Sequence, residues 1–175
     1  MIFIGLGANL PSRFGGPEAM IHKAYEALEK HDLCIVRASN IWFTAPVPFD
    51  PDQPWFRNSV VAVSTTKTPL RLMKILLDIE NELGRVRTIR NAPRVIDLDL
   101  LSYDSLCCDV PGLTLPHPRM HERAFVLNPL SEIAPNWTHP RTDQHIDRLI
   151  SAVPDDQQAY LDPPENVVDA VAAAK

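Results

Sequence analysis

The sequence predicts an α+β domain with a ferredoxin-like βαββαβ core, in which an antiparallel sheet has helices on one face, long loops and short C-terminal helices. Two observations support this fold class. The predicted elements follow the order strand, helix, strand, strand, helix, strand, which is the split βαβ pattern of such domains. The chain also has 175 residues, of which 45% are hydrophobic, enough for one domain with its own core. We therefore expect the core helices to cover one face of the sheet and to leave the other face free for a ligand.

The first half of the chain contains three predicted strands and one helix. Residues 1–7 alternate and are rich in β-forming residues, which predicts the first strand. Gly16 is a suitable cap for a helix over 17–30, whose apolar residues recur on one face. Apolar and valine-rich patterns predict further strands over 34–43 and 58–65.

A proline-rich loop separates the second and third predicted strands. Residues 44–55 contain Pro46, Pro48, Pro51 and Pro54, so this segment is irregular and semi-rigid. Long loops without secondary structure of their own are often functional. We expect this loop to close over a cleft on the free face of the sheet.

The second half of the chain predicts one long helix, one further core strand and several short elements. The helix begins after Thr68 and ends before Gly84, where an arginine-rich loop starts. A strand over 95–103 then completes the core, and Asp104 and Ser105 are suited to turn it into a short partner strand. The remaining predicted segments are that partner over 106–110, short helices over 125–133 and 143–153, and a polar tail over 154–175.

Composition and charge narrow the functional classes. We expect one domain over 1–153 and a tail over 154–175 whose order stays open. The formal net charge of −5 argues against nucleic-acid binding, because such proteins usually carry a basic surplus. The N-terminal apolar run lacks preceding basic residues, so it is read as neither a signal peptide nor a membrane span. Three cysteines without CxxC spacing indicate a reducing environment. We therefore expect a cytoplasmic monomer without nucleic-acid or membrane partners.

Two aspartates lie within a strand whose other residues are apolar. Side chains alternate along a strand, so Asp97 and Asp99 share one face. Two carboxylates this close repel each other, and a divalent cation is a natural compensation. Mg²⁺ suits this role because it binds one or two carboxylates together with water and substrate phosphates. Four arginines precede the two aspartates: Arg85, Arg87, Arg90 and Arg94. Arginine is the preferred bidentate partner of phosphate, so this pattern favours phosphoryl chemistry.

The same residues have plainer interpretations. Edge strands often carry charges that prevent aggregation, and exposed arginines form ion pairs that contribute little. A nucleotide-sugar transferase with an Asp-x-Asp pair is a second functional hypothesis, although the chain is short for one. A non-catalytic ferredoxin-like module that binds RNA or protein is a third, although adjacent surface aromatics and a basic face are not evident in the sequence.

Seven short motifs occur along the chain in a fixed order. They are GLGANL at 5–10, TAP at 44–46, QPWFRN at 53–58, ENELGR at 80–85, APRVIDLDLL at 92–101, LPHPR at 115–119 and RAFVL at 123–127. Each alone is a weak signal, but their joint occurrence is specific. Together, over roughly residues 1–150, they resemble the 6-hydroxymethyl-7,8-dihydropterin pyrophosphokinase family of folate biosynthesis. Many members of that family carry Trp-Gly where this chain has Asn91 and Ala92.

The resemblance implies an enzyme that transfers pyrophosphate from ATP to 6-hydroxymethyl-7,8-dihydropterin. The hydroxymethyl oxygen would attack the β-phosphorus in line, and AMP would leave. Asp97 and Asp99 would hold two Mg²⁺ ions, and these aspartates with Arg85 and Arg94 would form the catalytic set. The substrate contacts implied by the resemblance are Thr44, Val47, Phe56, Asn58 and Phe125 for the pterin, and Glu80, Arg85, Arg87, Arg94, Leu100, Leu113, Thr114, His117 and Arg123 for the nucleotide.

Overall fold

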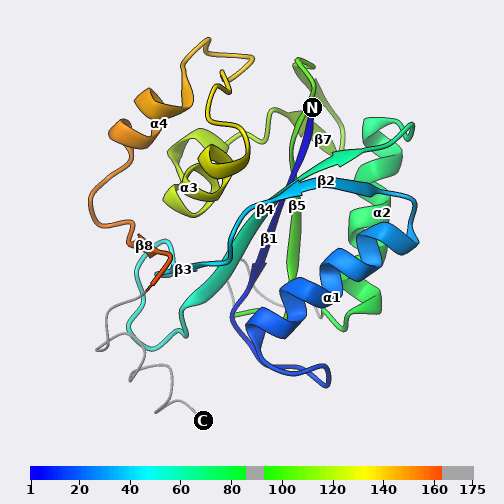
Figure 1. Cartoon of the computed structure of the whole chain (residues 1–175), viewed down its shortest axis with the longest axis vertical. Helices are drawn as coiled ribbons and strands as arrows, with labels where there is room; N and C mark the ends of the chain where they lie inside the picture. The colour runs from blue at the N-terminus through cyan, green and yellow to red at the C-terminus, as the bar shows by residue number, and fades with distance from the viewer. Residues whose placement is uncertain (86–92, 163–175) are drawn as a thin grey trace.

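An antiparallel six-stranded sheet forms the centre of the computed structural model, which describes residues 1–85 and 93–162. The elements are β1 (Ile2–Ala8), α1 (Pro17–Lys30), β2 (Cys34–Ala38), β3 (Trp42–Thr44), β4 (Phe56–Ser64), α2 (Pro69–Glu82), β5 (Asp97–Tyr103), β6 (Cys108–Val110), β7 (Leu113–Leu115), η1 (Met120–Glu122), α3 (Ala124–Ile133), α4 (Ile146–Ala152) and β8 (Ala159–Tyr160). The strand order is β5-β1-β4-β3-β8, and β2 also pairs with β4 (Figure 1). The predicted α+β fold class is confirmed.

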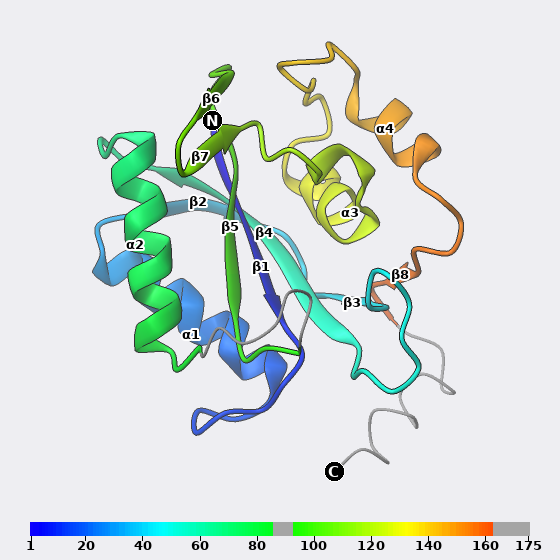
Figure 2. The ribbon, with the colours of Figure 1, turned by 180° about the vertical axis from the view of Figure 1, so that it is seen from behind.

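The two faces of the sheet pack against different helices. Ile2, Ile4 and Leu6 of β1 join the larger hydrophobic core, together with α1 and α2. Phe3 of the same strand lies on the other face, in a second cluster with α3 and α4. Figure 2 shows α1 and α2 on one side of the sheet and α3 on the other. The core helices therefore share one face, as predicted, while α3 covers part of the face expected to be free for a ligand.

The starts of the two core helices follow their sequence signals. α1 begins at Pro17 directly after Gly16, and α2 begins at Pro69 directly after Thr68. Proline suits this position because the N–H that it lacks would have no partner within the helix. Gly84 follows the end of α2 with a positive φ of 90°, a conformation that glycine adopts without strain.

The predicted strand over 34–43 is in fact two strands, β2 and β3, which both pair with β4. Between them Ser39 donates its N–H to Val60 O at 2.9 Å, and its Oγ accepts the Val60 N–H at 3.0 Å. A side-chain oxygen thus takes the place of a backbone acceptor, and the ladder is interrupted. Regular pairing resumes at Trp42, opposite Asn58.

The hairpin predicted between β5 and the next strand does not form. The chain turns at Asp104, which has a φ of 49°, but the next strand, β6, pairs with β7 and not with β5. Pro111 and Gly112 connect β6 to β7, and Gly112 has a φ of 82°. Pro-Gly is the sequence preferred at the centre of a type II turn. β6 and β7 therefore form a separate two-stranded sheet.

The predicted tail contributes a strand to the main sheet. Tyr160 and Ala159 form β8, which pairs with Phe43 and Thr44 of β3. The boundary predicted between residues 153 and 154 therefore does not separate the sheet from the rest of the chain. Residues 163–175 lie outside the described part of the chain.

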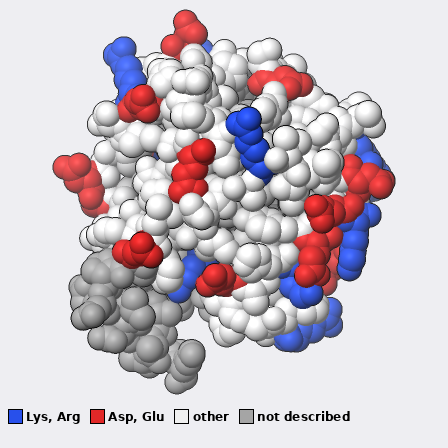
Figure 3. All heavy atoms as spheres, in the orientation of Figure 1, with Lys and Arg blue, Asp and Glu red and all other residues white. Residues whose placement is uncertain are grey.

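The molecular surface carries both signs of charge. On the face drawn in Figure 3, lysine and arginine side chains are interspersed with aspartate and glutamate. Within residues 1–85 and 93–162, no helix is long and apolar enough to cross a membrane. Cys34 and Cys107 are exposed thiols and Cys108 is partly buried, and none of the three forms a disulfide.

Candidate active site

A cavity of about 650 Å³ brings together most of the predicted site residues. It lies where β1, β4 and β5 meet α2, the proline-rich loop and the start of α3. The predicted residues that line it are Thr44, Val47, Phe56, Asn58, Glu80, Arg85, Arg94, Asp97, Asp99, His117, Arg123 and Phe125. The fold thus places the residues expected to bind two different substrates around one space.

Two glycines of the central strand line the cavity between β4 and β5. Gly5 pairs across the strands with Asp99, and Gly7 pairs with Asp97. On its other side Gly7 is opposite Asn58, and a Cβ at Gly7 would lie only 2.6 Å from Asn58 Oδ1. No side chain fits at this position without displacing its neighbour. Because Gly5 and Gly7 have no side chains, only backbone lies between the Asn58 amide on β4 and the carboxylates of Asp97 and Asp99 on β5.

Asp97 belongs to a network of charged side chains. Arg85 donates from Nη1 to Asp97 Oδ1 and to Glu80 Oε1, and Arg94 donates to Asp97 Oδ2. Glu80 Oε1 also accepts the N–H of Leu98 at 2.8 Å, which ties this carboxylate to β5. Burial acts to raise the pKa of Asp97, but the charges of Arg94 and Arg85 outweigh it and hold the pKa below its usual value. Asp97 is therefore ionised at neutral pH.

Asp99 lines the same cavity in a different environment. Its carboxylate makes no hydrogen bond with any residue in the described part of the chain. Burial raises the pKa of Asp99 to about 6, with repulsion from Asp97 as the second cause, while the charge of Arg123 acts in the opposite direction. A cation bound beside these oxygens would favour the ionised form and lower the pKa again.

The donor set fits a hard divalent cation that takes its remaining ligands from elsewhere. Asp97 and Asp99 present carboxylate oxygens to one cavity, and oxygen is the ligand that Mg²⁺ prefers. Among the described residues, no group of three or more His, Cys, Asp or Glu side chains is arranged to hold a metal. Mg²⁺ commonly binds through only one or two carboxylates and keeps water and phosphate ligands. A cation here would therefore depend on a bound phosphate as well as on the protein.

Three more basic side chains line the cavity near the two aspartates. The backbone N–H of His117 donates to Leu101 O at 2.7 Å, and the ring Nδ1 of His117 accepts the backbone N–H of Arg119 at 3.3 Å. Burial, together with the charges of Arg123 and Arg119, lowers the pKa of His117 to about 4, so the ring is neutral and carries its proton on Nε2. Burial also lowers the pKa of Arg123, which is next to a second arginine. An anion bound between Arg119 and Arg123 would offset the repulsion between their positive charges.

Two aromatic rings adjoin the arginines of the cavity. The Cζ atom of Arg94 lies 5.7 Å from the centroid of the Phe56 ring, and that of Arg123 lies 5.1 Å from the Phe125 ring. Guanidinium groups at such distances are attracted to the ring face. The cavity therefore changes from charged to aromatic across a short distance, with both rings next to the cationic wall.

Asn9 links the two loops that border the cavity, and it is not among the residues predicted from the sequence. Its Oδ1 accepts the N–H of Arg94 at 2.8 Å, and its own N–H donates to Arg94 O at 3.0 Å. Its Nδ2 donates to Pro54 O at 3.0 Å, at the end of the proline-rich loop. Asn9 is only 2% exposed. The sequence shows only an asparagine directly after an apolar strand, within the GLGANL motif, and its burial and partners appear in the fold. Arg119, Met73 and Leu77 also line the cavity without having been predicted to do so.

Among the predicted nucleotide contacts, three that the structure describes do not line the cavity, and a fourth lies outside the described residues. Leu100 and Leu113 are buried in the larger core beside α1 and α2, because the alternation along β5 and β7 turns them toward the helices. Thr114 of β7 does not line the cavity either. Arg87 lies within residues 86–92, as do Asn91 and Ala92, outside the described part of the chain. The nucleotide-binding roles of these four residues stay predictions.

Known proteins are similar to this chain in both sequence and fold. Residues 3–135 match the family model described as 7,8-dihydro-6-hydroxymethylpterin-pyrophosphokinase (HPPK). The chain is 43% identical over 134 residues to the 2-amino-4-hydroxy-6-hydroxymethyldihydropteridine pyrophosphokinase of Methylorubrum extorquens, and the match covers 77% of this chain and 82% of that relative.

Longer relatives contain a similar region. The folic acid synthesis protein FOL1 of Dictyostelium discoideum is 35% identical over 164 residues, which is 94% of this chain but only 24% of that protein. A crystal structure of a Plasmodium falciparum HPPK-DHPS triple mutant with STZ-DHP superposes with a TM-score of 0.67 at 14% identity, over 86% of this chain and 42% of that one. This structural likeness shows the fold alone. The family match over most of the chain, with relatives above 30% identity, shows that the chain belongs to the HPPK family.

Proposed function

We propose that this chain transfers the pyrophosphoryl group of ATP to the hydroxyl of 6-hydroxymethyl-7,8-dihydropterin, as one step of folate biosynthesis. The observation that supports this most directly is the composition of a single cavity. Its aromatic and amide residues suit a flat heterocycle, and its arginines and aspartates suit phosphates with a divalent cation. Membership of a family named for pyrophosphoryl transfer to a hydroxymethylpterin supports the same assignment.

The pterin would occupy the aromatic end of the cavity. Phe56 and Phe125 offer ring faces for stacking on a flat heterocycle. Asn58 is 6% exposed and donates from Nδ2 to Thr44 Oγ1 at 2.6 Å, which fixes the direction of the amide. Such an amide is suited to hydrogen-bond the polar edge of a pterin ring. We place the hydroxymethyl group on the side that faces the two carboxylates.

The ATP phosphates would occupy the charged end. The hydroxyl oxygen of the pterin forms a bond to the β-phosphorus, the bond from this phosphorus to the oxygen shared with the α-phosphate breaks, and AMP leaves with that oxygen. The hydroxyl proton passes to a carboxylate or to water. Arg85, Arg94 and Arg123 would offset the charge of the phosphates, and His117 would donate a hydrogen bond to a phosphate oxygen from Nε2. Mg²⁺ bound at Asp97 and Asp99 would supply further charge neutralisation and lower the pKa of the attacking hydroxyl.

The direct test is to incubate the protein with Mg²⁺, ATP and 6-hydroxymethyl-7,8-dihydropterin and to identify the nucleotide product. We expect AMP in equal amount to the pterin diphosphate, and no reaction when either Mg²⁺ or the pterin is left out. Formation of ADP, or consumption of ATP without the pterin, would contradict the proposed function.

Gly7→Ala is expected to weaken pterin binding roughly tenfold, because the added Cβ displaces the Asn58 amide and disturbs its hydrogen bond to Thr44. Gly16→Ala is the matched control, since a Cβ at Gly16 meets no atom within 4 Å. Equilibrium titration of both variants with the pterin measures the effect. Equal affinities in Gly7→Ala and the wild type would show that Asn58 does not recognise the pterin.

A further inference from the structure

The chain returns to the main sheet after α4. In Figure 1 it runs from α4 along the outside of the molecule to β8, which lies beside β3. We call residues 157–160 the C-terminal strap. The strap forms hydrogen bonds with Glu122 and Ala124 at the start of α3. It also forms hydrogen bonds with β3 and with Ala45, which follows β3. These two regions carry pterin contacts proposed above, yet no residue of the strap lines the cavity.

Gln157 of the strap binds the peptide groups on both sides of Arg123. Its Oε1 accepts the N–H of Ala124 at 3.0 Å, and its Nε2 donates to Glu122 O at 2.8 Å. Ala124 opens α3, so its N–H has no acceptor within the helix. Arg123 is the N-cap residue, and its own side chain makes no capping bond. The amide of Gln157 takes the place of a cap, and it fixes the backbone that presents Arg123 and, two residues later, Phe125.

The rest of the strap holds the proline-rich loop. Ala45 donates its N–H to Gln158 O at 3.0 Å, and Tyr160 pairs with Phe43. The ring of Tyr160 also stacks on Trp55, with centroids 6.0 Å apart and 20° between the planes. The strap therefore contacts the loop at both of its ends. One short segment thus ties the start of α3 to the loop on the other side of the pterin end.

We propose that Gln157 is a positioning residue for the transfer reaction, which sets the orientation of Arg123 and Phe125 without contacting a substrate. This role rests on the proposed function, because it assigns Phe125 to the pterin and Arg123 to the phosphates. Loss of the bridge lets the start of α3 shift, which changes stacking and phosphate binding together. The KM for the pterin then rises and kcat falls in the same variant. A bridge that served stability alone would lower the melting temperature and leave both kinetic constants unchanged.

Gln157→Met tests this role in the full chain, because methionine keeps the length of the side chain but cannot make the two amide hydrogen bonds. Gln158→Met is the matched control, since Gln158 is exposed and contacts Ala45 through its backbone carbonyl. We expect Gln157→Met to raise the KM for the pterin roughly tenfold and to lower kcat several-fold, as the loss of two hydrogen bonds implies. Gln158→Met should match the wild type. Amide hydrogen exchange without substrates should show faster exchange at Ala124 in Gln157→Met only.

The outcomes separate this role from the proposed function. Wild-type KM and kcat in Gln157→Met, or equal defects in the two methionine variants, overturn the positioning role and leave the proposed function intact. Unchanged exchange at Ala124 overturns it as well, since the bridge would then not hold the start of α3. If the wild type forms no AMP from ATP and the pterin, the proposed function fails first and the role of Gln157 in the reaction fails with it.

Discussion

Asp97→Asn and Asp99→Asn are each expected to slow AMP formation by about two to three orders of magnitude. An asparagine oxygen is neutral, so it holds Mg²⁺ less firmly and neutralises none of the charge of the cation. Both side chains line the cavity, so either substitution weakens the same proposed cation site. Steady-state rates measured over a range of Mg²⁺ concentrations should show lower maximal rates and a higher Mg²⁺ requirement.

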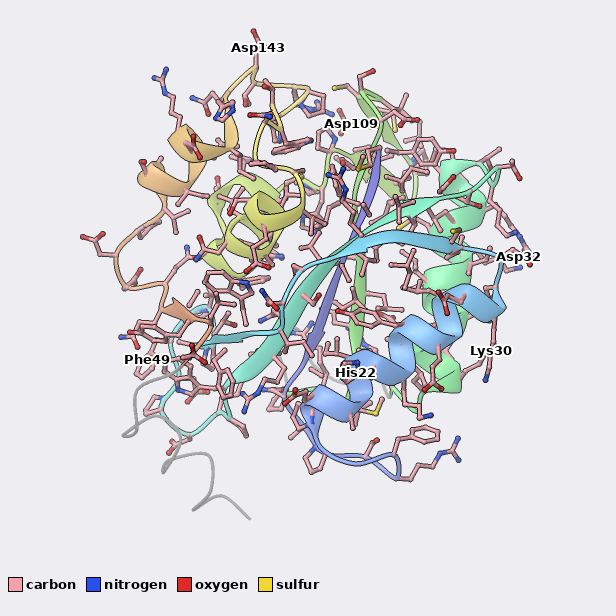
Figure 4. The ribbon with its side chains drawn as sticks, in the orientation of Figure 1. His22, Lys30, Asp32, Phe49, Asp109 and Asp143 are labelled. Carbon is pink, nitrogen blue, oxygen red and sulfur yellow. The ribbon has the colours of Figure 1, made fainter. Side chains whose placement is uncertain are left out.

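Asp109→Asn provides the control for these variants. Asp109 lies on β6 (Figure 4) and does not line the cavity. It accepts a hydrogen bond from Arg141 at 2.9 Å. This variant should keep full activity, and circular dichroism should show that all three variants are folded. Wild-type turnover in Asp97→Asn or Asp99→Asn would mean that the cation, if one is needed, binds elsewhere.

Asp99→Asn is further expected to make the ligand-free protein more stable. The pKa of Asp99 is about 6 in the folded protein, against an ordinary value of 3.8, so the fold favours the protonated carboxyl. The stability that this preference contributes is complete below about pH 4 and is lost as the pH rises through 6. Above that pH the wild type holds an unfavourable charge that asparagine lacks. The gain in the free energy of unfolding at pH 8 is at most about 3 kcal/mol.

Urea unfolding at pH 4 and pH 8, without Mg²⁺ and nucleotide, measures this gain. The difference between Asp99→Asn and the wild type should be small at pH 4 and largest at pH 8, because the effects of the other titrating groups cancel in the comparison. If Asp99→Asn differs from the wild type in stability by the same amount at pH 4 and at pH 8, the ionisation of Asp99 is not the cause. Together with its lost activity, a more stable Asp99→Asn would identify a carboxylate that lowers stability and is kept for its role in the reaction.

Local patterns predicted the elements that depend on local chemistry. Proline after a capping residue marked the starts of α1 and α2, and alternation along β5 placed Asp97 and Asp99 on one side of the sheet. The same alternation places Leu100 on the opposite side, in the core. Its predicted nucleotide role came from the resemblance and not from the strand pattern, which explains why the two disagree.

The features that were missed depend on partners far away in the sequence. The break between β2 and β3 comes from Ser39, whose Oγ accepts an N–H from β4, and no local pattern records that choice. β8 has two residues and exists only because β3 offers an edge for pairing. Asn9 joins two loops that the chain reaches more than forty residues later, so its role appears only in the fold. The turn at Pro111 and Gly112 is different, because its Pro-Gly signal was present in the sequence.

The register of the sheet also sets a length. Asn58, Gly7 and Asp97 lie in line on three adjacent strands. Neighbouring strands are about 4.8 Å apart, so the positions of the amide and the carboxylate are separated by about 10 Å across the sheet. Backbone hydrogen bonds maintain this separation, and side-chain substitutions change it little. In the proposed reaction this fixed separation would select for the length of the substrate, because a ring whose alcohol sits on a longer or shorter arm would present its oxygen away from the β-phosphorus.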